Sequence, residues 1–145
     1  LFLSALTTSE VYFVPFEEMR SFLNNDLEVK EYFLQYCSRC LRSDLDALLA
    51  VGTTSAEERF WILYAAFFMS MDANLDEEWL TLPFKLNRTS VSSLLFVSLL
   101  TIDRLYAQLL KQGLMKRDKG MYSLHSSGVK QGVAWIMRRH KENKP

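Results

Sequence analysis

The sequence predicts a mostly helical chain with a small β component, an α+β fold. Three observations carry this prediction. Apolar residues make up 49% of the chain, which is enough to bury a hydrophobic core. Residues 27–50 contain neither glycine nor proline and repeat apolar side chains at helical spacing. Near the C-terminal end, a second helical pattern is followed by a turn signal between short strand-like runs.

A formal net charge of zero hides an uneven distribution along the 145 residues, a length that suits one domain or two small ones. Residues 1–81 hold 5 basic and 14 acidic residues, a net charge of −9. Residues 82–145 hold 12 basic and 3 acidic residues, a net charge of +9. Such asymmetry suggests two modules with different partners.

Bulk features also exclude some classes of protein. The longest apolar stretch, residues 60–71, is too short to span a bilayer and predicts a buried helix. No basic flank or small-residue cleavage site marks a signal peptide, and the two cysteines need no oxidising compartment, so we expect a cytoplasmic protein. Because the chain begins at Leu1 rather than Met, we expect a piece of a longer protein.

The N-terminal segment predicts a strand and then a short helix. Residues 9–14 are rich in β-branched and aromatic side chains and stop at Pro15, as a strand would. Residues 16–23 follow with helical spacing and place Glu17 and Glu18 in the first turn, where the helix dipole favours acids. Residues 24–26 should close this helix and cap the next one.

Residues 27–50 predict one long amphipathic helix. A single helix of this length cannot bury its stripe against a small domain alone, so we expect it to pair with a second copy in coiled-coil fashion. The alternative is a helix packed wholly within its own chain. The expected dimer-interface residues are Leu34, Cys37, Leu41, Leu45 and Leu48, with Phe33, Tyr36 and Cys40 widening the stripe.

A break at residues 52–55 precedes a buried helix. Ser55 and Glu58 match a capping box, which predicts a helix start. This helix should run to about Met71 and, because residues 60–68 are apolar nearly all round, it should lie in a core. Residues 72–78 form an acidic loop, after which the composition turns basic.

The basic part predicts a helix over residues 87–95, a tight turn, a second helix over residues 99–112, and a hairpin. Together these elements make a winged helix-turn-helix, whose second helix would enter a DNA major groove while the wing holds phosphates. A short terminal helix over residues 129–145 should pack on this domain and end in a basic stub. The supporting signals are Ser98 as N-cap, a buried face of Ile102, Leu105, Leu109 and Leu110, Gly113 after the helix, and a turn at residues 118–120.

The ordered succession of these elements resembles the cyclic-AMP receptor protein/FNR (Crp/Fnr) family of bacterial transcription regulators. The resemblance covers residues 2–126. The Glu10-Val11 strand and the next helix resemble the end of the family's cyclic-nucleotide-type β-barrel, and residues 27–50 resemble its dimerisation helix. Spacing from Leu41 to Arg59 fits the hinge and first helix of the DNA-binding domain, and residues 98–124 resemble the recognition helix and wing.

This resemblance implies a division into three parts: a barrel remnant over residues 1–26, a dimerisation helix over residues 27–51, and a winged helix-turn-helix domain over residues 52–145. It implies a homodimer that binds double-stranded DNA, with RNA polymerase as a further partner and no membrane. It implies no enzymatic activity and no cofactor in this stretch, because the chain would begin after the phosphate-binding segment of the barrel. The effector of that barrel stays unknown.

Several positions depart from the family's pattern. Asp44 and Leu45 stand about where nucleotide-binding members offer small hydroxyl residues, which disfavours cyclic AMP as a ligand. Phe96 replaces the usual glycine of the turn. Leu99 and Leu100 replace the common Arg and Glu, and a leucine can contact only thymine methyl groups or the protein's own core.

Other positions agree with the pattern. Arg104 matches a position that reads a base, typically guanine, and Thr101 matches one near the groove floor. A phosphate contact or a solvated surface charge is the alternative role for Arg104, and Ser98 is already explained as a cap. The expected DNA-binding residues are Arg88, Thr89, Ser98, Leu99, Leu100, Thr101, Arg104, Lys116, Arg117 and Lys119.

Two other interpretations remain. A winged-helix module that has lost base reading and binds a protein partner would explain Phe96, Leu99 and Leu100, and exposure of these side chains without a basic rim would favour it. Cys37 and Cys40 form a CxxC, but nothing nearby supplies further metal ligands, so we expect two small apolar residues beside the dimer seam, with a redox or inter-subunit pair as the alternative. No metal site and no catalytic motif is expected.

Overall fold

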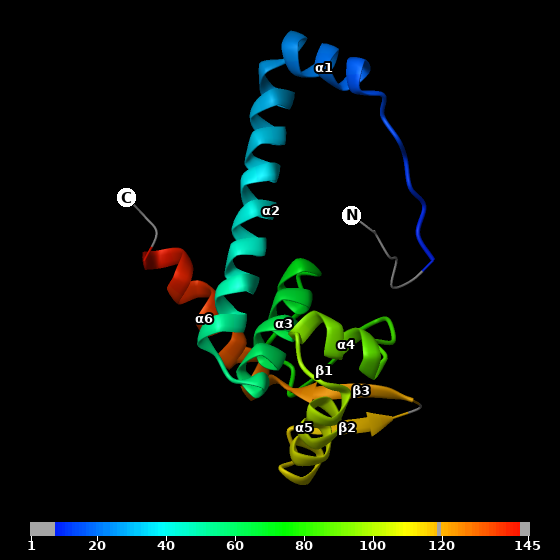
Figure 1. Ribbon diagram of the computed structural model, residues 1–145, viewed down its shortest axis with the longest axis vertical. Helices are drawn as coiled ribbons and strands as arrows, with labels where there is room; N and C mark the ends of the chain where they lie inside the picture. The colour runs from blue at the N-terminus through cyan, green and yellow to red at the C-terminus, as the bar shows by residue number, and fades with distance from the viewer. Residues whose placement is uncertain (1–7, 119, 143–145) are drawn as a thin grey trace. The chain divides into compact units, whose positions relative to one another are not determined.

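The computed structural model describes residues 8–118 and 120–142, and it shows a mostly helical α+β fold with one small antiparallel sheet (Figure 1). The chain divides into two compact units, Leu1–Leu48 and Leu49–Pro145. In chain order the elements are α1 (Phe16–Asn25), α2 (Leu27–Thr53), α3 (Ala56–Ser70), β1 (Trp79–Thr81), α4 (Arg88–Leu95), α5 (Leu99–Lys111), β2 (Met115–Asp118), β3 (Met121–His125) and α6 (Ser126–Glu142).

The first unit contains α1 and most of α2. As expected, the two helices meet at Asp26, whose carboxylate accepts hydrogen bonds from the backbone N–H groups of Glu28 and Val29 at 3.0 and 3.1 Å. The predicted strand at residues 9–14 is wrong, because residues 8–15 have no regular secondary structure. A strand needs a hydrogen-bonding neighbour, and the described part of this unit offers only helices.

In the described part of the first unit, no apolar side chain is buried. Helix α2 runs without interruption from Leu27 to Thr53, three residues beyond the predicted end. Its stripe lies open to solvent, with Leu34 at 55%, Leu41 at 65% and Leu48 at 65% exposure. Nothing in the described part of the first unit buries these three leucines.

The second unit is built on α3. Its N-terminus forms the predicted capping box, in which the Ser55 hydroxyl accepts from the Glu58 N–H and the Glu58 carboxylate accepts from the Ser55 N–H at 2.7 Å. The hydrogen bond that the Glu58 carboxylate accepts from the Ser55 backbone N–H, followed by its interaction with the Ser55 side chain, lowers the pKa of the Glu58 carboxyl. Five α3 side chains are buried, as predicted for a helix that is apolar nearly all round: Phe60, Trp61, Tyr64, Ala65 and Phe68.

A three-stranded antiparallel sheet in the order β1-β3-β2 closes one side of this core. The hairpin between β2 and β3 was predicted, and Gly120 takes the left-handed conformation (φ +84°) in its two-residue loop. Strand β1 was not predicted. It pairs Leu80 with Leu124 of β3 and carries the loop from α3 onto the sheet.

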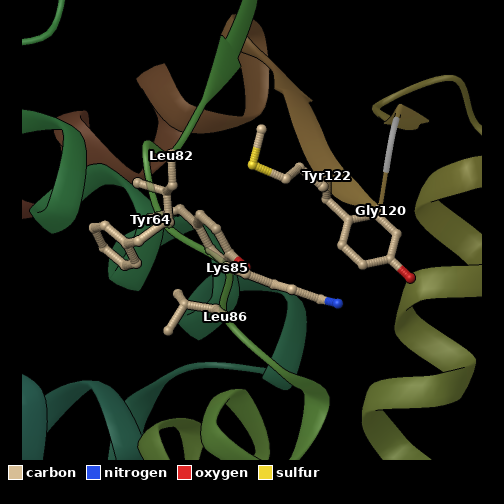
Figure 2. A pocket seen from close by; sticks show the side chains of 8 residues that line it. Tyr64, Leu82, Lys85, Leu86, Gly120 and Tyr122 are labelled. Carbon is tan, nitrogen blue, oxygen red and sulfur yellow. The ribbon is translucent and has the colours of Figure 1, made fainter. Parts of the chain in front are cut away.

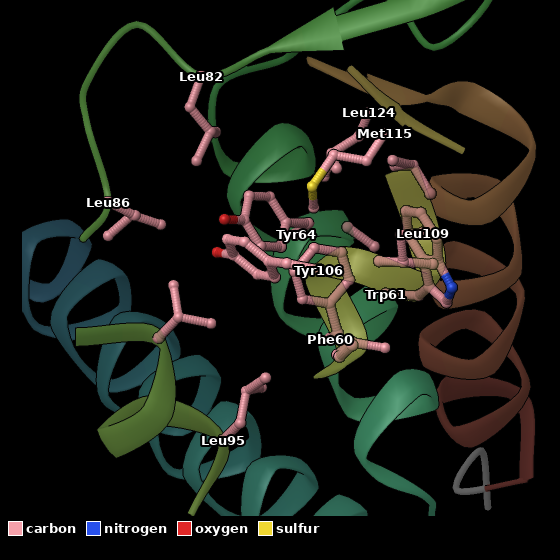
Figure 3. Packing of buried hydrophobic residues seen from close by; sticks show 14 of the residues in the cluster. Phe60, Trp61, Tyr64, Leu82, Leu86, Leu95, Tyr106, Leu109, Met115 and Leu124 are labelled. Carbon is pink, nitrogen blue, oxygen red and sulfur yellow. The ribbon is translucent and has the colours of Figure 1, made fainter. Parts of the chain in front are cut away.

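The core is aromatic at its centre (Figure 3). The Phe60 ring contacts Trp61 and Tyr106 edge to face, at centroid distances of 5.1 and 5.9 Å. Tyr106 comes from α5, where sequence spacing had assigned Leu110 to the buried face. That assignment is wrong, since Leu110 is 43% exposed and Tyr106 is buried in its place.

Helices α3 and α6 lie side by side (Figure 1) and approach each other at two glycines. A Cβ atom built on Gly132 would overlap the Trp61 carbonyl oxygen, and one built on Gly128 would lie 2.6 Å from the Trp61 ring. Both glycines are thus needed for close approach rather than for backbone freedom. Helix α6 begins earlier than predicted, at Ser126, and stays helical to Glu142 where a frayed stub was expected.

Helices α4 and α5 form the predicted helix-turn-helix, with a bend of 107° between them. The turn is closed by Ser92, whose carbonyl accepts from the Val97 N–H at 3.1 Å and whose hydroxyl donates to the Val97 carbonyl at 2.6 Å. No single helix in the described ranges is long and apolar enough to cross a membrane, and α4 with α5 reaches that composition only as this bent pair.

Phe96 occupies the one position of this turn that favours glycine. Its backbone is left-handed (φ 53°, ψ 48°), and its ring is 70% exposed. A left-handed conformation costs a residue with a Cβ atom about 1–2 kcal/mol. Phe96 therefore carries backbone strain that its own packing does little to offset.

We expect Gly132→Ala to destabilise the second unit, since its Cβ would overlap the Trp61 backbone and force α6 away from α3. The loss in the free energy of unfolding should be about 1–3 kcal/mol, as for other overpacked cores. The matched control is Gly52→Ala in α2, where no atom lies within 4 Å of the new Cβ. That variant should gain about 0.5–1 kcal/mol from helix propensity. Urea unfolding compares the two, and equal effects would contradict the packing described.

We expect Phe96→Gly to be more stable than Phe96→Ala by about 1 kcal/mol, because only glycine relieves the left-handed strain. Both variants remove the exposed ring, so the comparison isolates the backbone contribution. Thermal unfolding of the two variants measures it. A Phe96→Gly protein that melts below Phe96→Ala would rule out a left-handed residue at this turn.

Candidate nucleic-acid interface

Helix α5 has one buried face and one open face. Ile102, Leu105, Tyr106 and Leu109 face the core. Leu100 (57%) and Arg104 lie exposed on the other side, and Leu99 (43%) lies at the edge between the two faces. Positions 100 and 104 are one helical turn apart, so the leucine and the arginine are neighbours on the same face.

The N-terminus of α5 is capped as predicted. The Ser98 hydroxyl accepts from the Thr101 N–H at 3.1 Å and lies 2.9 Å from the Thr101 hydroxyl. Both hydroxyls are therefore engaged with each other and with the cap. At the other end, Gly113 is left-handed (φ +70°), and the N–H of Leu114 donates to the carbonyl of Leu109 at 2.9 Å, as in a Schellman motif.

Arg88 is tied to α5. Its guanidinium donates a hydrogen bond to the carboxylate of Asp103 and forms an ion pair with it, although both side chains are about half exposed. This pair joins the first turn of α4 to the middle of α5. Thr89 lies beside it, exposed, behind the Asn87 cap that accepts from the Ser90 N–H at 2.8 Å. Arg88 thus links the two helices of the helix-turn-helix at the surface, and it is also a candidate phosphate contact.

The wing presents two cations supported by aromatic rings. The Lys116 ammonium lies 4.1 Å from the centre of the Trp79 ring, and the Arg117 guanidinium lies 5.8 Å from that of Tyr122. Both cations are exposed on β2. Lys119, the third predicted wing contact, lies outside the described residues.

The predicted dimer-interface residues all lie on α2. Leu45 is 59% exposed, like the leucines on either side of it, whereas Cys37 is half buried. Cys37 and Cys40 are free thiols. A hydrogen bond with Cys40 is the main cause that raises the pKa of the Tyr36 hydroxyl.

The second unit holds a small pocket beside the hairpin and a larger pocket of about 420 Å³, which Thr53, Glu58, Trp135 and Arg138 line among others. No group of three or more His, Cys, Asp or Glu residues is placed to hold a metal ion within residues 8–118 and 120–142. The pocket beside the hairpin in Figure 2, lined by Tyr64, Lys85 and Tyr122 among others, has a volume of about 20 Å³, enough for one water molecule. Burial raises the pKa of the Tyr64 hydroxyl, so this group stays protonated at neutral pH.

Two features of this surface had escaped the sequence pattern. Asp103 stands 15 residues from Arg88, and no local spacing rule links them. Trp79 belongs to the unpredicted strand β1, whose three residues are too few to give a periodic signal. Asp103 contacts Arg88 and Trp79 contacts Lys116, two basic residues that the sequence had already indicated.

No family model matches the chain, and no curated protein sequence matches it either. Among solved structures, it is similar to FixK2 from Bradyrhizobium japonicum, with 23% sequence identity and a TM-score of 0.56. The similarity covers 79% of this chain and 57% of the FixK2 chain, so this chain spans little more than half the length of that structure. At this level of identity the similarity shows the fold alone, an α+β fold with a winged helix-turn-helix like that of FixK2.

Proposed function

We propose that the chain is a sequence-specific, DNA-binding transcription regulator of the Crp/Fnr type, which acts in the bacterial cytoplasm as a homodimer. The observation that carries the proposal is the open face of α5 in a winged helix-turn-helix, with Arg104 exposed on it. FixK2, the structural neighbour, is a Crp/Fnr family regulator, which favours the same function. Helix α5 would enter the major groove, and Arg104 would read a base there.

Charge supports DNA as the partner. Residues 82–145 hold 12 basic and 3 acidic residues. The single acidic residue of α5, Asp103, forms an ion pair with Arg88. The first turn of α5 contains no acidic residue. Lys116 and Arg117 on the wing would contact phosphates on either side of the groove.

The exposed stripe of α2 supports the homodimer. Leu34, Leu41, Leu45 and Leu48 are each more than half exposed in the isolated chain, and water-exposed leucines at heptad-like spacing are stabilised by a second helix. Two copies would offer two recognition helices to half-sites about one DNA turn apart. Cys37 would lie within that seam as a small apolar residue.

A second candidate function is a winged-helix module that binds a protein. Four exposed apolar side chains around the turn favour it: Leu94 (42%), Phe96 (70%), Leu99 (43%) and Leu100 (57%). The exposed Arg104 on the same helix favours DNA instead, since an apolar protein-binding patch needs no cation there. Binding to DNA at low salt decides between the two.

We expect the chain to bind duplex DNA with an affinity that falls as salt rises, because each phosphate contact releases counterions. A plot of log K against log salt concentration should fall with a slope of about −0.9 for each phosphate neutralised. Fluorescence anisotropy across a salt series measures this slope. A stoichiometric titration on a duplex with two half-sites should give two chains per duplex.

Absence of binding at low salt, or binding that ignores salt, would contradict DNA as the partner. One chain per two-site duplex would contradict the homodimer while leaving DNA binding intact. The double variant Leu41→Glu/Leu48→Glu should lose the two-chain complex, because both substitutions place like charges opposite each other in the α2–α2 interface.

Arg104 and Lys116 should differ in what they contribute to binding. We expect Arg104→Ala to cost about 1–3 kcal/mol of binding and to relax the preference at one base pair. We expect Lys116→Ala to weaken all sequences alike and to reduce the salt slope by about 1. Anisotropy on a set of single-base variants of a selected duplex measures both, with Lys30→Ala on α2 as a control of equal charge change. Uniform weakening by Arg104→Ala would assign it to a phosphate instead.

A further inference from the structure

We propose that the second unit holds a binding site for a small aromatic carboxylic acid, in the pocket lined by the end of α2, the start of α3 and α6. The pocket has a volume of about 420 Å³. Sites for small molecules have volumes of about 300–1,000 Å³, so this one has room for such a ligand. The site is independent of DNA binding, because none of its lining residues belongs to the helix-turn-helix or to the wing.

Helix α6 presents an aromatic ring and two cations to this pocket. Positions 135, 138 and 139 are three and four residues apart, so Trp135, Arg138 and Arg139 share one face of the helix. Arg138 is exposed, and it takes part in none of the ion pairs between described side chains. A guanidinium binds a carboxylate through two parallel hydrogen bonds and stacks on flat rings. The α6 residues therefore suit the acid group and the ring of an aromatic acid.

The residues that α2 and α3 contribute are hydrogen-bond acceptors. The Thr53 hydroxyl donates to the carbonyl of Leu49 at 2.7 Å. The Thr54 hydroxyl donates to the carbonyl of Ala50 at 2.6 Å. Because a hydroxyl has one proton to donate, each can only accept from a ligand. The Glu58 carboxyl, whose pKa is lowered by its bond with the Ser55 N–H, is ionised at neutral pH and also accepts. These residues disfavour a carboxylate and favour an N–H or O–H group.

Contacts within the second unit hold the walls of this pocket in place. The Arg59 guanidinium donates to the carbonyl of Val51 at 2.7 Å, which ties α3 to the last turn of α2. Gly132 lets α6 approach the α3 backbone closely at Trp61. The pocket is thus formed before a ligand binds, so little binding energy is lost in ordering its walls.

The arrangement of donors and acceptors defines the ligand. Its carboxylate would contact Arg138 and Arg139, and its ring would lie beside Trp135. An N–H or O–H group on the ring would donate to the acceptors of α2 and α3. A nucleic acid suits the pocket less well, because the ionised Glu58 would repel its phosphates. The compound para-hydroxyphenylacetate combines an acid, a ring and a donor, and it serves as the probe.

The test uses the full chain, labelled with ¹⁵N and free of DNA. Each of the three tryptophans gives one indole N–H signal in an NMR spectrum, and the signal that is lost in Trp135→Phe is that of Trp135. Titration with para-hydroxyphenylacetate should shift this signal until it saturates. The matched amide, para-hydroxyphenylacetamide, keeps the ring and the hydroxyl but has no charge. It should bind about ten-fold more weakly, because hydrogen bonds to charged groups are the strong ones.

Matched variants show which residues are responsible. Arg138→Gln should weaken binding of the probe about ten-fold, because it removes the cation. The control is Lys130→Gln, an equal charge change at an exposed position of α6 that does not line the pocket, and it should bind like the wild type. Equal melting temperatures would show that both variants are folded.

A second comparison tests the acceptors of α2. The wild-type chain should prefer para-hydroxyphenylacetate over phenylacetate about five-fold, because only the former has a hydroxyl to donate. The double variant Thr53→Val/Thr54→Val should lose this preference, since valine keeps the shape of threonine without its oxygen. A wild-type chain that binds both acids equally would overturn the proposed role of these hydroxyls.

The remaining outcomes support or overturn the site as a whole. A saturable shift of the Trp135 signal that needs both the charge of the probe and Arg138 supports it. Equal binding of acid and amide overturns it, and so does an Arg138→Gln variant that binds like the wild type. A Trp135 signal that does not move at millimolar probe also overturns it. Because no DNA is present, each of these results leaves the proposed DNA-binding function to its own test.

Discussion

The second unit depends on one constraint: the apolar helix α3 must be enclosed by other elements. The helix buries side chains from Phe60 to Phe68 on most of its circumference, so it is stable only when other elements enclose it. Helix α6 approaches its backbone at Gly132, and α5 supplies Tyr106 against the Phe60 ring. The orientation of α5 follows from the apolar side chains that it buries in this core. The side chains on its opposite face stay exposed.

The exposed face of α5 defines the proposed DNA interface. Because α5 uses its core-facing positions on α3 and the sheet, the exposed residues of its first half reduce to two leucines and Arg104. The Arg88–Asp103 ion pair links α4 to α5 at the surface, while the buried side chains of Val91 and Leu95 pack α4 into the core. Exposed ion pairs add little stability, so the buried apolar contacts of α4, rather than this pair, hold the two helices together.

Sequence reasoning succeeded where local chemistry decides structure. Caps at Asp26, Ser55 and Ser98, the left-handed Gly113 and the hairpin at Gly120 all follow from short-range rules, and the structure confirms them. It failed where a partner far along the chain decides. The strand at residues 9–14 lacks a neighbour, and strand β1 exists because β3 is there to pair with it. The base-reading and dimer roles stay predictions.

The uneven charge does not follow the division of the chain into two units. Charge changes sign near residue 81, whereas the units divide between Leu48 and Leu49. Residues 49–145 therefore hold 13 basic and 9 acidic residues, and six of those acids fall within residues 57–78, before the helix-turn-helix begins. Along the sequence, this unit is polarised rather than uniformly basic.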